Sequence, residues 1–275
     1  MKSINCKGKL VDLSSPKVMG ILNLTPDSFY DGGKYKSDND ILKQVELMLS
    51  QGATFIDIGG YSSRPKAKHI SEEEELIRLI PAINNIVSHF PEILISVDTF
   101  RSKVALESIA HGACMINDIS AGSMDENMFA TVAKLQVPYV IMHMLGTPQN
   151  MQNNTLYKDL VKEVLFYFSE KIHELRKLGV NDLILDPGFG FSKTLDQNFE
   201  LLSKLELFAF LDLPILTGLS RKSMLYKLLD IKPQEALNAT SVANTIALQK
   251  GSNILRVHDV KEAMEAIRIV EKSNF

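Results

Sequence analysis

The sequence lacks most features of secreted, membrane or nucleic-acid-binding proteins. It has only two cysteines, Cys6 and Cys114, and their spacing does not match a metal site. No signal peptide precedes the chain and no long apolar run interrupts it. A formal net charge of −3 gives no general attraction to nucleic acid or to an anionic membrane. We therefore expect a cytoplasmic protein with two structural thiols and with neither a nucleic-acid nor a membrane partner.

Three further absences limit the possible domain organisation and the kinds of ligand site that the chain can form. The chain has no G-x-x-x-x-G-K-[ST] loop for nucleotide phosphates and no cluster of His, Cys and Glu that could form a metal cage from protein alone. It also has no linker, low-complexity tract or charge block, so residues 1–275 read as a single domain. Any anionic ligand must be held by a local cluster of basic residues. A metal, if one is used, would be magnesium carried in with a phosphorylated ligand.

Eight short apolar runs are present, and each ends in polar or charged residues. They span Val18–Gly33, Thr54–Pro65, Ile95–Thr99, Met115–Asp118, Tyr139–Met144, Leu183–Phe191, Pro214–Lys222 and Ile254–Asp259. Buried parallel strands are apolar on both faces, so polar residues at one end of every run mark where the strands open to solvent. The length of 275 residues and the hydrophobic share of 45% suit one (β/α)₈ TIM barrel, whose active site lies at the carboxyl ends of its strands.

Helical patterns separate these runs. The segment Ser71–Glu74 has the S-x-x-E form of a capping box and predicts a helix beginning at Ser71, with a kink at Pro81. A second amphipathic pattern covers Leu156–Leu178, and Gly179 predicts its end. The segment Ile4–Leu13 predicts a short β-hairpin around a glycine turn that closes the bottom of the barrel.

Acidic and amide side chains gather at the strand ends. They are Asp57, Asp98, Asp118, Asp186, Asn23 and Asn117. One carboxylate in such a place is usually a helix cap or loop anchor, but several converging on one pore indicate a binding site. Carboxylate and amide oxygens accept hydrogen bonds, so the ligand should be rich in N–H donors. A polar heterocycle with amino and ring N–H groups would fit.

Basic residues follow other strands, and Arg256 with His258 is the most informative pair. At spacing i, i+2 the two share one face of a strand, and with Val257 opposite, that face points into the pore. A cationic pair there calls for an anion, and phosphate commonly binds near the last two strands of this fold. For the remaining basic residues, a solvated surface charge is the simpler interpretation. These are Arg64, Lys66, Lys68, Arg221 and Lys222. His143, a lone histidine at a strand end, is expected to be structural.

Two glycine-bearing segments are too long for simple strand-to-helix turns. They are 25–35 and 59–69, the long loops after the first and second strands. Loops of this kind are usually surface connections, yet these two carry Phe29, Asp31, Ser63 and Arg64. We expect them to act as lids.

Together these segments resemble a known family. The matching motifs, in order, are N-L-T-P-D-S-F-x-D-G-G, D-I-G-G-x-S-S-R-P, S-V-D-T, I-N-D, H-M-x-G-T-P-x-x-M-Q, L-D-P-G-F-G-F, S-R-K and R-V-H-D. In this order and spacing they closely resemble the bacterial dihydropteroate synthases over essentially the whole barrel. That family of transferases is a sulfonamide target. It condenses 6-hydroxymethyl-7,8-dihydropterin diphosphate with para-aminobenzoate to give 7,8-dihydropteroate and pyrophosphate in folate synthesis.

The resemblance implies a role for each matching residue. The pterin pocket would consist of Asp98, Asn117, Met142, Asp186, Phe191 and Lys222. The diphosphate would be held by Asn23, Ser63, Arg64, Arg256 and His258, with Asn23 also a ligand of Mg²⁺. Para-aminobenzoate would contact Phe29, Ser63, Arg64, Pro65, Phe191, Lys222 and Ser223. The groups implied in catalysis are Asp31, Asn23, Lys222, Arg256 and His258. Asp31 would help to stabilise a cationic carbon in a dissociative substitution. The resemblance also implies a homodimer, formed through the last helices around Glu235–Lys250 and Val260–Val270.

One segment departs from the family, and three other functions stay open. The family commonly reads G-G-E-S-T-R-P-G where this chain has Tyr61, Ser63 and Lys66 in place of the glutamate, threonine and final glycine. Ser63 keeps the hydroxyl, whereas Lys66 adds charge and removes a flexible glycine. The alternatives are a pterin-binding methyltransferase that acts on a corrinoid, a non-catalytic pterin-binding paralogue and a sugar-phosphate barrel. Arg256 with His258 and the loop carrying Asp31 argue against the methyltransferase, which has no pyrophosphate to hold.

Overall fold

A parallel barrel forms the centre of the molecule. The computed structural model describes residues 2–24, 38–62 and 69–273. The eight-stranded sheet has the order β8-β7-β6-β5-β4-β3-β10-β9, and a bridge between Leu185 and Ile215 links β8 to β9, so the barrel is nearly closed. The strands are β3 (Lys17–Asn23), β4 (Phe55–Gly59), β5 (Leu94–Asp98), β6 (Met115–Asp118), β7 (Tyr139–Met142), β8 (Leu183–Asp186), β9 (Leu216–Thr217) and β10 (Ile254–Val257). The predicted TIM barrel is confirmed.

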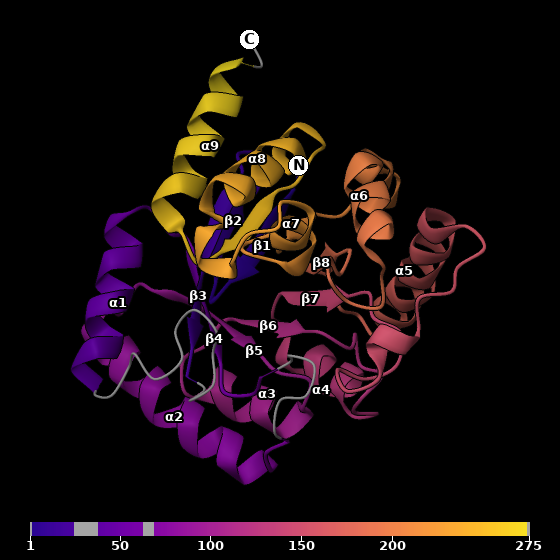
Figure 1. Ribbon diagram of the computed structural model, residues 1–275. Helices are drawn as coiled ribbons and strands as arrows, with labels where there is room; N and C mark the ends of the chain where they lie inside the picture. The colour runs from indigo at the N-terminus through magenta and orange to yellow at the C-terminus, as the bar shows by residue number, and fades with distance from the viewer. Residues whose placement is uncertain (1, 25–37, 63–68, 274–275) are drawn as a thin grey trace.

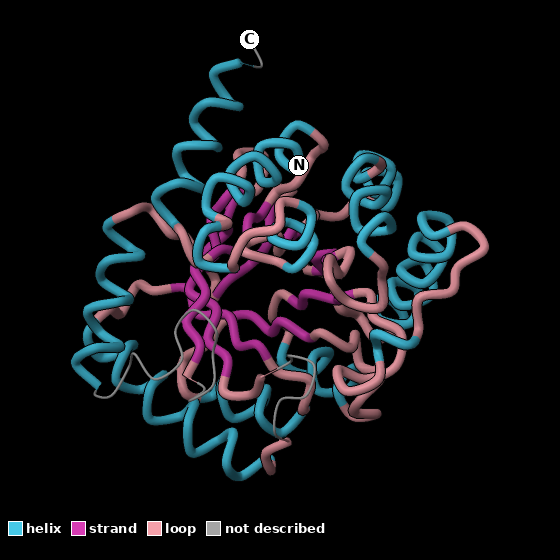
Figure 2. Tube along the Cα trace, in the orientation of Figure 1, coloured by secondary structure: helices cyan, strands magenta, loops and turns pink. Residues whose placement is uncertain are grey.

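Helices surround the strands, as Figures 1 and 2 show. They are α1 (Asp38–Ser50), α2 (Glu72–His89), α3 (Ser102–Ala110), α4 (Met128–Leu135), α5 (Leu160–Lys177), α6 (Leu195–Ser203), α7 (Ser223–Leu228), α8 (Leu237–Gln249) and α9 (Val260–Ser273). Short 3₁₀ turns η1 (Met151–Asn153), η2 (Leu205–Leu211) and η3 (Pro233–Glu235) lie among them. No helix in the described part of the chain combines the length and apolar character needed to cross a membrane.

Two helix starts differ in detail from the predictions. Ser71 caps α2 as expected, since its hydroxyl accepts a hydrogen bond from the Glu74 backbone N–H at 3.1 Å. The Glu74 carboxylate, however, pairs with Arg78 one turn later, so the reciprocal half of the capping box is missing. Helix α5 begins at Leu160 rather than at Leu156, because the Asp159 carboxylate caps the Lys162 backbone N–H.

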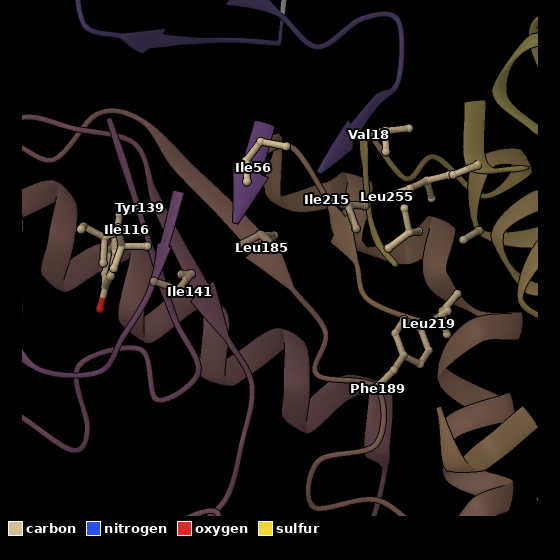
Figure 3. Close-up of a cluster of buried hydrophobic side chains, with 14 of the residues drawn as sticks. Val18, Ile56, Ile116, Tyr139, Ile141, Leu185, Phe189, Ile215, Leu219 and Leu255 are labelled. Atoms are coloured by element: carbon tan, nitrogen blue, oxygen red, sulfur yellow. The ribbon is translucent and has the colours of Figure 1, made fainter. Parts of the chain in front are cut away.

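Alternation along the strands separates two apolar regions. The even-numbered residues of β4, Ile56 and Ile58, join the large core between the barrel and its helices. Figure 3 shows Ile56 there together with Ile141 and Leu185 from β7 and β8. The intervening residues, Phe55, Asp57 and Gly59, face the barrel interior, because successive side chains of a strand point to opposite faces.

The hairpin closes the amino end of the barrel. Strands β1 (Ser3–Cys6) and β2 (Lys9–Asp12) are antiparallel, and Lys7 and Gly8 turn between them with positive φ. Their buried side chains pack on one residue from each barrel strand, and we call this set the amino-end layer. It comprises Ile4, Cys6, Val11, Leu13, Met19, Phe55, Leu94, Cys114, Met115, Val140, Ile184, Leu216 and Ile254. The predicted hairpin is confirmed, and both thiols are buried within this layer.

Candidate active site

Register places the predicted acceptors in one row around the barrel mouth. Asn23 pairs with Gly59, Gly59 with Asp98, and Asp98 with Asn117 across β3, β4, β5 and β6. On the far side, Met142 at the end of β7 pairs with Asp186 at the end of β8. Each of these residues lies above the amino-end layer on the interior face of its strand. Of the predicted acceptors, Asn23, Asp98, Asn117 and Asp186 are thus brought together at this end of the barrel.

Arg256 on β10 bonds to carboxylates of β4 and β5 at this end of the barrel. Its Nε donates to Asp57 Oδ2 at 2.6 Å, and its Nη2 donates to Asp98 Oδ2 at 2.8 Å. Asp57 Oδ2 also accepts a hydrogen bond from Asn117 Nδ2 at 3.1 Å. Arg256 faces the interior while Val257 lies in the outer core, as the i, i+2 spacing predicted.

The electrostatic surroundings of Asp98 are unusual for a carboxyl group. Loss of water around it raises its pKa to about 7, an effect that Arg256 opposes and the negative charge of Asp57 reinforces. Burial likewise raises the pKa of Asp186, while Lys222 and the backbone N–H of Gly188, which donates to Asp186 Oδ1 at 2.8 Å, oppose that rise. The pocket therefore holds hydrogen-bond acceptors whose charge is balanced by nearby cations.

Lys222 lies beside the segment that follows β8. Its ammonium group donates to the carbonyl oxygen of Phe189 and lies 4.9 Å from the ring centroid of Phe191. Burial lowers the pKa of Lys222 to about 8, and the charge of Asp186 opposes this shift. Phe191 also packs against the apolar cluster that contains Met142. Ser223 is the first residue of α7, directly after Lys222. The residues predicted for the pterin pocket are therefore neighbours.

His258 follows β10 at the same end of the barrel. Its Nδ1 lies 3.0 Å from Ser220 Oγ, and its backbone N–H donates to the same oxygen at 3.2 Å. Arg221, by contrast, forms a two-bond ion pair with Asp259, with both N–O distances at 2.9 Å. Arg221 thus joins the loop after β9 to the start of α9 and is not a solvated surface charge.

Sequence reasoning missed Lys193. This buried lysine donates to His143 Nδ1 and to the carbonyl oxygens of Gly188 and Phe191, each at 3.0 Å. It thereby fixes the segment that carries Phe191. The pKa of His143 falls to about 2, through burial and the charge of Lys193, so the imidazole is neutral and structural, as predicted. The only signal for Lys193 in the sequence was its position directly after the glycine-bearing run 187–192.

Asp118 is a loop anchor and does not belong to the acceptor row. Its oxygens accept hydrogen bonds from the backbone N–H and hydroxyl of Ser120, from the Gly122 N–H and from the Tyr139 hydroxyl, at 2.7–2.8 Å. This is the structural alternative that a carboxylate after a strand always allows.

Tyr61, where the chain departs from the family motif, is buried at the base of the second long loop. Its ring packs edge-on against Phe100 with centroids 5.0 Å apart. Its hydroxyl accepts a hydrogen bond from Gln149 Nε2 at 3.1 Å and lies 3.2 Å from His69 Nδ1. Tyr61 therefore ties residues on both sides of 63–68 to the loop that follows β7.

Five of the predicted residues lie outside the described part of the chain. They are Phe29, Asp31, Ser63, Arg64 and Pro65, and Lys66 lies there as well. Asn23, at the end of β3, is described, and its side chain makes no hydrogen bond to another described residue. No described residue therefore competes with a ligand for the Asn23 amide oxygen.

Comparisons with known proteins agree with this geometry. The family model described as "Pterin binding enzyme" matches residues 19–258. The chain is 46% identical to the dihydropteroate synthase of Escherichia coli strain K12 over 267 residues, which is 96% of this chain and 94% of that one. It is 43% identical to the Haemophilus influenzae dihydropteroate synthase over 263 residues, 95% of each chain.

Solved structures give the same result. A Yersinia pestis dihydropteroate synthase in a sulfonamide drug complex superposes with a TM-score of 0.95 and 43% identity over 99% of both chains. A Xanthomonas albilineans dihydropteroate synthase in complex with 7,8-dihydropteroate has a TM-score of 0.87 and 34% identity, covering 99% of this chain and 98% of that one. This chain has the same barrel fold over nearly its whole length. It belongs to the pterin-binding enzyme family and is a transferase with dihydropteroate synthase function.

Proposed function

We propose that this enzyme joins its substrates by a dissociative substitution, in which the pterin CH₂–O bond breaks before the amine of para-aminobenzoate attacks. The observation that carries the proposal is the position of Arg256, a cation among the acceptors that suit a pterin ring. Such an arrangement can bind the heterocycle and stabilise an anionic leaving group in the same cavity.

The pterin ring is rich in N–H donors, and the row of acceptors suits it. Asp98, Asn117 and Asp186 would accept hydrogen bonds from the ring and its amino group, while Lys222 would donate to a ring acceptor. Met142 and Phe191 would cover the ring with apolar surface. These contacts hold the methylene carbon near Arg256.

In the first step, the electron pair of the CH₂–O bond passes to the diphosphate oxygen and leaves a cation on the methylene carbon. The ring nitrogens delocalise that positive charge, while Arg256 and His258 stabilise the departing pyrophosphate. We assign Asp31 to stabilisation of the same cationic carbon, by its place in the family motif.

In the second step, the amine nitrogen attacks the methylene carbon and then releases a proton to water. A strong protein base is unnecessary, because the N–H bond becomes acidic once nitrogen has bonded to carbon. We assign Phe29, Ser63, Arg64, Pro65, Phe191, Lys222 and Ser223 to the para-aminobenzoate site. Ser63 and Arg64 would also contact the diphosphate.

The donor set suits a magnesium ion that arrives with the diphosphate. Among the described residues no group of three His, Cys, Asp or Glu side chains could hold a metal, but the Asn23 amide oxygen has no competing partner there. Mg²⁺ is commonly bound through one or two protein oxygens plus substrate phosphates. Bound in this way, the ion would supply further positive charge to the leaving group.

The order of bond breaking can be tested with ring-substituted para-aminobenzoates in single-turnover experiments. If the CH₂–O bond breaks first, the rate constant of the chemical step should vary little with the basicity of the amine. A steep increase with basicity would show that the amine takes part in bond breaking. Repeating the series with Asn23→Ala across a Mg²⁺ titration would test the metal assignment, which predicts a higher Mg²⁺ requirement.

We also propose a homodimer in a reducing cytoplasm. Helices α8 and α9 expose Val242 and Ile269, with 54% and 68% of their surfaces accessible, and apolar side chains of this kind suit an interface. Two free cysteines, Cys6 and Cys114, suit a reducing compartment. Light scattering should give twice the chain mass of 30.7 kDa, and Val242→Asp should lower it.

A further inference from the structure

Asp57 is a fully buried carboxylate that can affect ligand binding without contacting the substrate. It lies in the middle of β4, below the row of acceptors, and its side chain faces the barrel interior. Oδ2 accepts hydrogen bonds from Arg256 Nε and Asn117 Nδ2, whereas Oδ1 is buried with no hydrogen-bond partner among the described residues. A buried charge with one unsatisfied oxygen is costly, so its remaining contacts must be strong.

The contact with Asn117 sets the orientation of an amide. Ionised Asp57 can only accept hydrogen bonds, so the NH₂ group of Asn117 must face it. The amide oxygen of Asn117 is then left on the opposite side, where an N–H donor of a ligand can reach it. A neutral group in place of Asp57 would not impose this choice.

The contact with Arg256 fixes a cation. A guanidinium held at Nε by Asp57 and at Nη2 by Asp98 has a defined plane and depth in the barrel. With Asp57 neutralised, Asp98 would become the sole anion bonded to Arg256, and the guanidinium would move toward it. Asp57 thus links the β10 cation to the β6 amide through one oxygen atom.

We propose that Asp57 is a positioning residue, which orients Asn117 toward the pterin ring and Arg256 toward the diphosphate at the same time. The proposal rests on the functions assigned above to Asn117 and Arg256. It makes one carboxylate responsible for the geometry of two binding subsites.

The sign of the change in anion affinity tests the proposal, with inorganic pyrophosphate as the probe. If Asp57 were only a nearby negative charge, Asp57→Asn would remove repulsion and tighten pyrophosphate binding. If Asp57 positions Arg256, the same variant should weaken pyrophosphate binding at least fivefold. Calorimetry should also show weaker binding of an unphosphorylated pterin analogue, since the Asn117 amide loses its fixed orientation.

Double-mutant cycles then assign each effect to its partner. In an Arg256→Ala background, Asp57→Asn should cause no further loss of pyrophosphate affinity. In an Asn117→Ala background, it should cause no further loss of pterin affinity. Additive losses in both cycles would overturn the proposal, because Asp57 would then act independently of both residues.

Asp118→Asn is the matched control, since Asp118 is a buried carboxylate at the same barrel end, and within the described part of the chain it bonds to its own loop and to Tyr139. It should lower the melting temperature without changing either affinity at 25 °C. If Asp118→Asn weakens both ligands as much as Asp57→Asn, the effect is one of general stability and the proposal is wrong. If Arg256→Ala itself leaves pyrophosphate affinity unchanged, the assigned function of Arg256 fails, and this proposal fails with it. If Asp57→Asn binds pyrophosphate more tightly while Arg256→Ala binds it more weakly, this proposal is overturned. The function assigned to Arg256 would then still stand.

Discussion

The Asp98 carboxyl group has a pKa near neutrality, about 7, because it is partly removed from water and lies near Asp57. A pterin N–H group needs the carboxylate form as acceptor, so binding favours the deprotonated enzyme. Pterin affinity should therefore be full above pH 7 and fall as the pH drops below it, approaching tenfold per pH unit. Titration calorimetry with an unphosphorylated pterin analogue between pH 5.5 and 8 would measure this slope.

Asp98→Asn provides the internal control for that pH dependence. The variant should bind the analogue weakly, and its affinity should vary much less over the same pH range. If the slope persists in Asp98→Asn, then another group titrates, and Lys193, with a pKa lowered to about 7 by burial, would be the next candidate.

Asp186 allows a prediction at fixed pH. Asp186→Asn keeps an oxygen that can still accept from the Gly188 N–H, so the fold should be retained. Loss of the charged acceptor should weaken pterin binding by about 1.5–3 kcal/mol. Calorimetry at pH 8 would check this value, and an unchanged affinity would remove Asp186 from the pocket.

Single residues also show the limit of sequence reasoning. Asp98, Asn117 and Asp186 were identifiable because they end apolar runs, and strand ends meet at one edge of a parallel barrel. Asp118 ends a run in the same way yet bonds to its own loop, and no pattern along the chain separates the two cases. Lys193 was missed because its partners, His143 and Gly188, become neighbours only when β7 and β8 pair.

At the scale of elements, Tyr61 joins the loops after β4 and β7. Tyr61→Phe keeps the packing against Phe100 but removes the hydroxyl that contacts His69 and Gln149. We expect a loss of about 0.5–1.5 kcal/mol of unfolding free energy for each net hydrogen bond. Urea unfolding would measure it. Tyr226→Phe is the control, since the Tyr226 hydroxyl bonds to none of the described residues and its removal should change stability little.

The hairpin offers a test of the amino-end layer. Ile4 on β1 is buried against the barrel strands, and Ile4→Ala should lower the unfolding free energy by about 2–5 kcal/mol. Because the catalytic end of the barrel is unaffected, kcat and both KM values at 25 °C should stay unchanged. Leu10→Ala on the same hairpin should be nearly neutral, since Leu10 is 69% exposed. A large change in KM for Ile4→Ala would show that the two barrel ends are coupled.

Helix ends could be predicted from the sequence where a few adjacent residues determine them. Ser71 and Gly179 marked one helix start and one helix end correctly, because capping and the left-handed turn depend on a few adjacent residues. Residues 156–159 have a helical pattern of apolar spacing but lie before the helix, because Asp159 provides the cap four residues later than the pattern suggested. Periodicity alone does not choose between two possible starts.

At the scale of the whole molecule, alternation along each strand explains both the stability and the site. Interior positions near the amino ends are apolar and form the amino-end layer, while interior positions further along the strands include Asp57, Asp98, Asn117, Asp186 and Arg256. The sequence allowed the barrel and this division to be predicted, since both follow from strand periodicity. It did not reveal that Arg256 bridges two carboxylates, because this contact reaches from β10 to side chains on β4 and β5, which are not its neighbouring strands.

Because the hairpin closes the amino end, the barrel interior opens at the carboxyl ends of the strands. Substrates and products must therefore pass through that one opening. Both substrates enter and both products leave past the same rim, so the molecule that sits deepest must arrive first and depart last. Pterin diphosphate loaded before a chase with unlabelled substrate should be carried forward to product, whereas preloaded para-aminobenzoate should be lost to the chase. Equal trapping of both would indicate random entry, which a barrel closed at its amino end would not favour.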